Sequence, residues 1–160
     1  MKGYAGDSER ITVIGQSAGA AHLASAIFLG LLKKSNVFLE GVILLGGPLR
    51  YDLRQERRKK NMFLYRNTNS EEVLKKMAVA FFCNGNLEDI DLDKFVIVLG
   101  EYDSEEIARS NIIFVEEYLK KLKRLPVLEV LEGENHISYF LRIGLEGDRL
   151  GKSILEFVGN

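Results

Sequence analysis

The chain has 160 residues, 46% hydrophobic and 28% charged, with a net charge of −1 at pH 7. These values are typical of one globular domain and exclude a disordered or fibrous protein. They give no general attraction to nucleic acid or to an anionic membrane surface, and no apolar run is long enough to span a membrane. Segment 1–10 lacks a signal-peptide core, and the single cysteine, Cys83, cannot form an internal disulfide. We therefore expect a cytoplasmic protein with a buried thiol.

Four short apolar runs predict β-strands at 11–14, 42–45, 95–99 and 127–131. The first three are nearly continuous in apolar residues, as in parallel strands covered on both faces, whereas the fourth is mixed and suits an outer strand. Between them, helical periodicity covers 17–34, 107–124 and 145–158. This alternation predicts an α/β fold, a three-layer sandwich in which a parallel sheet of about four strands carries helices on both faces.

The segment at about 48–85 breaks this alternation. It is long and charged, and it predicts two or three short helices, one beginning near 69–72, inserted over the carboxyl edge of the sheet. Its basic stretch at 50–60 suits a nuclear-targeting or nucleic-acid patch, but the interspersed acids favour a solvated helix. The apolar residues at 62–65 suit either a lid over a pocket or plain packing. We treat the whole chain, 1–160, as a single domain with this insertion.

The sequence Gly15-Gln16-Ser17-Ala18-Gly19 follows the first predicted strand and opens the first predicted helix. A nucleophile elbow, the strained turn that lifts a catalytic serine clear of a sheet, needs this context and small residues around the serine. The helix N-terminus would aim its free N–H groups at the site, so the amide of Ala18 is the candidate oxyanion donor. The alternative is that Ser17 only caps the helix.

A nucleophilic serine needs a base, and the chain has two histidines. His22 lies five residues after Ser17, roughly 140° around the same helix, so its ring should point away from the serine and take a packing or hydrogen-bonding role. His136 follows the last predicted strand, at the carboxyl edge where the elbow also lies. By elimination and position, His136 is the candidate base.

The candidate acid is Asp103, which follows the third predicted strand at the same edge. It would hold the imidazole tautomer and stabilise the charged ring. Glu101 is the nearest competitor, with a solvated loop acid as its alternative role, and Asp103 itself has helix capping as its alternative. The chain order serine, acid, histidine is that of α/β-hydrolases.

Three stretches carry a family resemblance: GDSERITVIGQSAGAAHLASAIF, VIVLGEYDSEE and EGENHISYFLRIGLEGDRLGKSILEFV. They resemble the elbow, acid loop and histidine loop of α/β-hydrolases of the carboxylesterase and hormone-sensitive-lipase-like groups. Together they are similar to small kynurenine formamidase-like and prenylcysteine methylesterase-like enzymes. The resemblance implies hydrolysis of a small carboxylic ester or aryl formamide through an acyl-enzyme, without metal or cofactor. It assigns nucleophile, acid and base to Ser17, Asp103 and His136.

Such enzymes carry about four strands before the elbow and a His-Gly-Gly-Gly loop that supplies further oxyanion donors. This sequence has no such loop, since LLGGPL follows the serine. The resemblance therefore implies the carboxyl-terminal part of an esterase, whose first strand presents an apolar edge suited to self-association. The alternative is a non-catalytic remnant or binding module that retains the triad by descent.

Overall fold

The computed structural model describes residues 10–50, 53–77 and 94–159, and the predictions for segment 1–9 and for Cys83 lie outside these ranges. The described residues contain one four-stranded sheet, β1 (Thr12–Gln16), β2 (Gly41–Leu45), β3 (Phe95–Gly100) and β4 (Val127–Leu131). The strands lie side by side in chain order, and every neighbouring pair is parallel. The predicted parallel α/β sheet is therefore confirmed, and β4 is an outer strand as its mixed pattern indicates. Strand β1 is the other outer strand of the described sheet and is only partly buried, so the expectation that it is covered on both faces is wrong.

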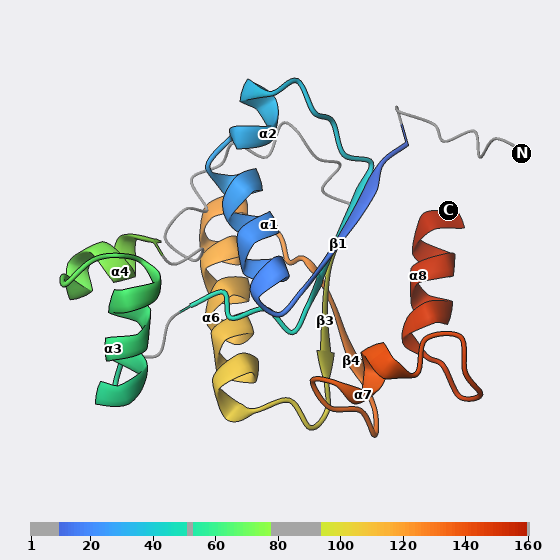
Figure 1. Cartoon of the computed structure of the whole chain (residues 1–160). Coiled ribbons are helices and arrows are strands. Elements are labelled where there is room, and N and C mark those ends of the chain that lie inside the picture. The colour runs from blue at the N-terminus through green and yellow to red at the C-terminus, as the bar shows by residue number, and fades with distance from the viewer. Residues whose placement is uncertain (1–9, 51–52, 78–93, 160) are drawn as a thin grey trace, which may run out of the picture.

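Helices cover both faces of this sheet (Figure 1). Helices α1 (Ala18–Phe28) and α6 (Glu105–Leu122) pack on one face, and the other carries α7 (Ser138–Leu141) and α8 (Leu150–Gly159). All residues of β2 and β3 are buried, which explains their unbroken apolar runs. Because all four strands run in the same direction, their carboxyl ends and the loops that follow them lie along one edge of the sheet.

The core under α1 and α6 is aromatic. Phe28, Phe95 and Phe114 pack with ring centroids 5.6 to 6.3 Å apart, and Tyr118 extends the cluster. A second core under α7 and α8 holds alternate residues of β2 and β3, with Tyr139 and Leu150. Because adjacent residues of a strand point to opposite faces, each central strand contributes to both cores.

The helices differ from the sequence prediction at their ends. The helix predicted at 17–34 is two helices, α1 and α2 (Leu31–Lys34), because Gly30 adopts φ 65° and its N–H donates to the Ile27 carbonyl at 2.9 Å, a glycine helix stop. Helix α8 begins after residue 145 because Gly147 has φ 79° and the Asp148 carboxylate accepts the Gly151 N–H at 2.6 Å.

The predicted insertion contains α3 (Glu56–Tyr65) and α4 (Glu71–Met77), which lie outside the α1 and α6 layer (Figure 1). The Ser70 hydroxyl accepts the Val73 N–H at the start of α4, near the predicted beginning of that helix. Helix α3 has no buried residue, as its charged composition predicts. None of the helices in the described ranges is long and apolar enough to cross a membrane.

Candidate active site

Ser17 occupies the turn between β1 and α1 in a strained backbone conformation. Its φ and ψ are 51° and −119°, outside the regions that L-residues favour, at a cost of about 1–3 kcal/mol. The Ser17 N–H donates to the Leu45 carbonyl at 2.8 Å, which ties the turn to the end of β2. The serine makes no side-chain capping hydrogen bond to α1. Helix capping therefore does not explain this residue, and strain of this kind is typical of nucleophile elbows.

Glycine at position 15 lets the strand and the helix approach closely. A Cβ added to Gly15 would lie 2.8 Å from the Ala20 Cα and from the Gly19 carbonyl oxygen. A Cβ on Gly19 would meet nothing within 4 Å, so the expectation that space also requires a small residue there is wrong. The two glycines of the motif therefore have different roles, although the pattern treats them alike.

Asp103 and His136 come together from the loops after β3 and β4. The His136 Nδ1 lies 3.0 Å from the Asp103 Oδ1, and the aspartate side chain is 1% exposed. The other carboxylate oxygen accepts the Gly100 N–H at 2.8 Å. Both oxygens of the buried carboxylate are thus occupied, and the Nε2 atom of the histidine ring is left for other chemistry.

Hydrogen bonds in the loop after β3 distinguish the alternative roles of Asp103 and Glu101. Ser104, not Asp103, caps α6, since its hydroxyl accepts the Ile107 N–H at 3.3 Å. The exposed Glu101 carboxylate accepts the Gly133 N–H at 2.8 Å and so joins the loops after β3 and β4. Glu101 therefore braces the histidine loop and does not contact the histidine ring.

Ser17 and His136 both contact the end of β2. The serine N–H is bound by the carbonyl of Leu45, and a Cβ added to the next residue, Gly46, would lie 2.8 Å from the His136 Nδ1. The Gln16 side-chain amide also donates to the His136 carbonyl at 3.3 Å. No hydrogen bond joins the Ser17 hydroxyl to the His136 ring, both of which are among the described residues. The structure brings the candidate acid, Asp103, and the candidate base, His136, into contact, and it places Ser17 at the same sheet edge.

The histidine loop is held by residues that the sequence patterns do not single out. The Glu134 side chain is 4% exposed; it pairs with Arg142 at 3.3 Å and accepts the Ser138 hydroxyl. Its carbonyl accepts the Tyr102 N–H at 2.8 Å, and the Asn135 side chain accepts two N–H groups of the next turn. From sequence alone, a glutamate beside a glycine in a loop is expected to be exposed to solvent. The burial of Glu134 is therefore evident only from the tertiary fold.

Tyr139 is a second residue that the sequence did not reveal. Its ring lies edge-on to His136, with centroids 6.4 Å apart, and its buried hydroxyl has no hydrogen-bond partner. Burial first, and then the Asp103 carboxylate, raise the pKa of Tyr139 to about 12, and the nearby Gln16 amide offsets part of that rise without reaching hydrogen-bond geometry. The hydroxyl therefore stays neutral beside the acid and base at ordinary pH.

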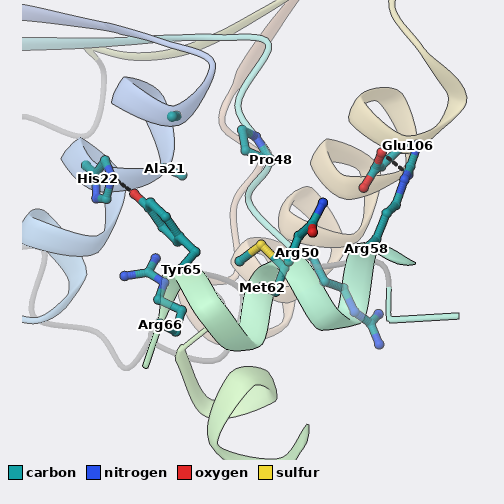
Figure 2. A pocket seen from close by; sticks show the side chains of 11 residues that line it. Ala21, His22, Pro48, Arg50, Arg58, Met62, Tyr65, Arg66 and Glu106 are labelled. Carbon is teal, nitrogen blue, oxygen red and sulfur yellow. Dashed lines mark hydrogen bonds and ion pairs between the residues drawn. The ribbon is translucent and has the colours of Figure 1, made fainter. Parts of the chain in front are cut away.

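A cavity of about 370 Å³ lies between α1 and α3 (Figure 2). It begins at Ala18, next to the serine, and continues past Ala21 and His22. The His22 Nε2 lies 2.7 Å from the Tyr65 hydroxyl on α3, so His22 has the hydrogen-bonding role expected of it. Met62 and Tyr65 line the cavity, which favours a pocket-facing role for these two residues over plain packing. Within residues 10–50, 53–77 and 94–159, no three His, Cys, Asp or Glu side chains gather as a metal site.

No protein-family model matches the chain, and no curated protein matches its sequence. Its fold is similar to that of carboxyl esterase 2 from the fungus Tuber melanosporum, with a TM-score of 0.66 at 16% identity over 96% of this chain and 55% of that one. It is also similar to esterase Est2 from Thermogutta terrifontis, with a TM-score of 0.64 at 17% identity over 93% of this chain and 52% of that one.

A further solved structure with this fold is Thermogutta terrifontis esterase 2 phosphonylated by sarin, with a TM-score of 0.63 at 16% identity. It is matched over 91% of this chain and 53% of its own length. The chain thus spans about half the length of these esterases. The parallel sheet, the helices on both faces and these likenesses together show that nearly the whole chain has an α/β-hydrolase fold, which corresponds to about half of each of these esterases.

Proposed function

We propose that the protein is a serine hydrolase of small carboxylic esters or aryl formamides, with Ser17 as nucleophile, His136 as base and Asp103 as acid. The observation that carries the proposal is the buried Asp103–His136 pair, 3.0 Å apart, at the sheet edge where Ser17 sits in a strained turn. Strain of this kind persists where the surrounding structure enforces it, and it concentrates at active sites. The esterase folds that the chain resembles support the same reaction class.

In the proposed reaction, the Ser17 hydroxyl oxygen attacks the carbonyl carbon of the substrate, and its proton passes to the His136 Nε2. Asp103 binds Nδ1 and stabilises the charged imidazolium. The negative oxygen of the tetrahedral intermediate faces the N–H of Ala18, a first-turn amide with no acceptor inside the helix. Collapse breaks the ester or amide bond, and His136 returns the proton to the leaving alcohol or amine. Water, deprotonated by His136, then attacks the acyl carbon; the bond to the Ser17 oxygen breaks, His136 returns the proton to that oxygen, and the carboxylic acid product leaves.

A fluorophosphonate probe tests the nucleophile directly, because it bonds covalently to an activated serine. We expect one probe adduct, mapped by mass spectrometry to the peptide containing Ser17, and no adduct in Ser17→Ala. Ser25→Ala is the matched control, since Ser25 lies on α1 and its hydroxyl is bound to the Ala21 carbonyl at 2.7 Å. Absence of labelling at high probe concentration, in a chain shown to be folded by circular dichroism, would overturn the assignment.

The second candidate is a non-catalytic binding module that retains these residues. It is favoured by the outer position of β1, which pairs only with β2 among the described residues and leaves Ile14 42% exposed. An open strand edge is a surface for pairing with a second copy of the chain. This candidate predicts no probe labelling and no ester turnover, together with a dimer mass by light scattering. A monomer that labels at Ser17 contradicts it.

A further inference from the structure

We propose that the cavity between α1 and α3 is a binding site for a carboxylate-bearing group on an apolar spacer, so that the preferred substrates are anionic esters or amides. The preference for anionic substrates rests on the proposed function, whereas the preference of the cavity for binding a carboxylate does not. The lining of the cavity includes Ala18, the residue that follows Ser17, so the cavity lies next to the proposed nucleophile. Its volume of about 370 Å³ falls within the range of small-molecule sites.

Part of the cavity wall is apolar. Its lining includes Ala18, Ala21 and Pro48, and Met62 lines it from α3 (Figure 2). Methionine is flexible and polarisable, so it adapts to spacers of different shape. The hydrogen bond between His22 and Tyr65 joins α1 to α3 at one end of the cavity and sets their separation there. This part of the site therefore favours an alkyl or aryl segment.

The charge around the cavity is positive. Among the described residues, three arginines line it, Arg50, Arg58 and Arg66, together with one carboxylate, Glu106. Glu106 forms an ion pair with Arg58, as Figure 2 shows. A described lining that is rich in arginine and whose carboxylate is paired favours an anion, and a guanidinium can bind both oxygens of a carboxylate at once.

Arg50 lines the cavity, and hydrogen bonds to α6 hold its backbone in place. Its N–H donates to the Ser110 hydroxyl at 2.6 Å, and that hydroxyl donates to the Arg50 carbonyl at 3.3 Å. Ser110 is 4% exposed, and the next residue on α6, Asn111, donates from its side chain to the Gly47 carbonyl at 2.8 Å. The loop after β2 is thus pinned to α6 on both sides of Pro48. An anchored arginine spends less conformational entropy on binding than one on a mobile loop.

Arg50 interacts only weakly with the Glu117 carboxylate on α6. The pKa of Glu117 is lowered mainly by its hydrogen bond to Lys120, and Arg50 is the weakest of the cations that lower it. Arg66 serves a different purpose, because its guanidinium lies 5.1 Å from the centre of the Tyr65 ring. Arg50 is therefore the residue whose replacement tests the proposal most directly.

The experiment compares two ligands of nearly equal shape, 4-phenylbutyrate and its neutral amide, 4-phenylbutyramide. Binding is measured by NMR titration on Ser17→Ala, so that turnover does not enter. We expect the carboxylate to bind at least about tenfold more tightly than the amide at low salt, with the advantage falling as salt rises. Shifted amide signals should come from α1, α3 and the loop at 46–50.

Adding Arg50→Gln should reduce the preference for the carboxylate to less than about threefold while leaving amide binding in place, which also shows that the variant is folded. Arg10→Gln is the matched control, because Arg10 pairs with Glu40 at the opposite end of β1 and should not alter the preference. Equal binding of the two ligands, no binding of either, or an unchanged preference in Arg50→Gln would each overturn the proposal. A retained carboxylate preference in a chain whose Ser17 resists the fluorophosphonate probe would refute the hydrolase assignment alone.

Discussion

The candidate site has two parts that differ in burial: the Asp103–His136 pair, here called the acid–base side, and the cavity between α1 and α3, here called the cavity side. The acid–base side is buried: the Asp103 side chain is 1% exposed, and hydrogen bonds from Gly100 and around Glu134 fix the loops that carry the pair. The cavity side depends on α3, which has no buried residue and is joined to its neighbours through polar contacts of half-exposed or exposed side chains. The contrast shows that the candidate acid–base pair lies in the buried part of the fold, whereas the cavity is lined by an exposed helix.

The largest expected effect of breaking the acid–base side comes from Asp103→Asn. The amide keeps the shape of the carboxylate but no longer stabilises a charged His136 ring, so we expect the rate of ester hydrolysis or of fluorophosphonate labelling to fall by about 10⁴-fold. Glu101→Gln is the control, since this exposed acid bonds only to the Gly133 N–H in the adjacent loop. A loss at Glu101 that equals or exceeds the loss at Asp103 would exchange their roles.

The next effect is on the stability of the elbow. Gly15→Ala places a methyl group 2.8 Å from the Ala20 backbone, so we expect the free energy of unfolding to fall by about 1–3 kcal/mol in urea denaturation. Gly19→Ala should instead be neutral or stabilising by up to about 1 kcal/mol, because its methyl group meets nothing and alanine favours the helix. Equal destabilisation by both changes would contradict the close approach of β1 and α1.

A smaller effect depends on pH and on Tyr139. The pKa of the Tyr139 hydroxyl is about 12 in the folded chain and about 10 in an unfolded chain. The folded state therefore favours the neutral hydroxyl over the phenolate. The resulting stability is present below about pH 10 and is lost as the pH rises towards 12. Between pH 8 and 11.5, the wild type should lose about 1–2 kcal/mol more than Tyr139→Phe in urea unfolding. Tyr102→Phe, at a position 67% exposed, should follow the wild type.

The smallest effect is expected on the cavity side. Lys59 on α3 contacts Glu56 and, on α4, Glu71, and these hydrogen bonds raise its pKa and lower that of Glu71. Ion pairs near a surface contribute little, so Lys59→Gln should lower the melting temperature by less than about 3 °C and leave labelling at Ser17 unchanged. A large loss of stability would show that α3 is held as firmly as the acid–base side.

The parallel sheet and the proximity of Asp103 to His136 could be predicted because they depend on local pattern. The unbroken apolar runs of β2 and β3 do belong to central strands, although the similar run of β1 belongs to an outer strand. Residues that follow parallel strands meet at one edge of the sheet. This reasoning anticipated that Asp103 and His136 would lie close together. The end of α1 before Gly30 could also have been predicted, because glycine commonly ends a helix by adopting a positive φ.

The parts that could not be predicted depend on contacts between distant segments. Glu134 and Tyr139 have no pattern that separates a buried partner of the site from an ordinary loop acid or helix residue. The cavity requires α3 to lie against α1, and the His22–Tyr65 hydrogen bond that joins them spans 43 positions in the chain. The anchoring of Arg50 by Ser110 likewise joins residues 60 positions apart.

The end of β2 contacts both the candidate nucleophile and the candidate base. The Ser17 N–H donates to the Leu45 carbonyl, and the His136 ring packs against Gly46, whose φ of 50° and missing side chain make room for it. All residues of β2 are buried. We therefore expect the spacing between Ser17 and His136 to depend more on this central strand than on movements of the outer strands β1 and β4.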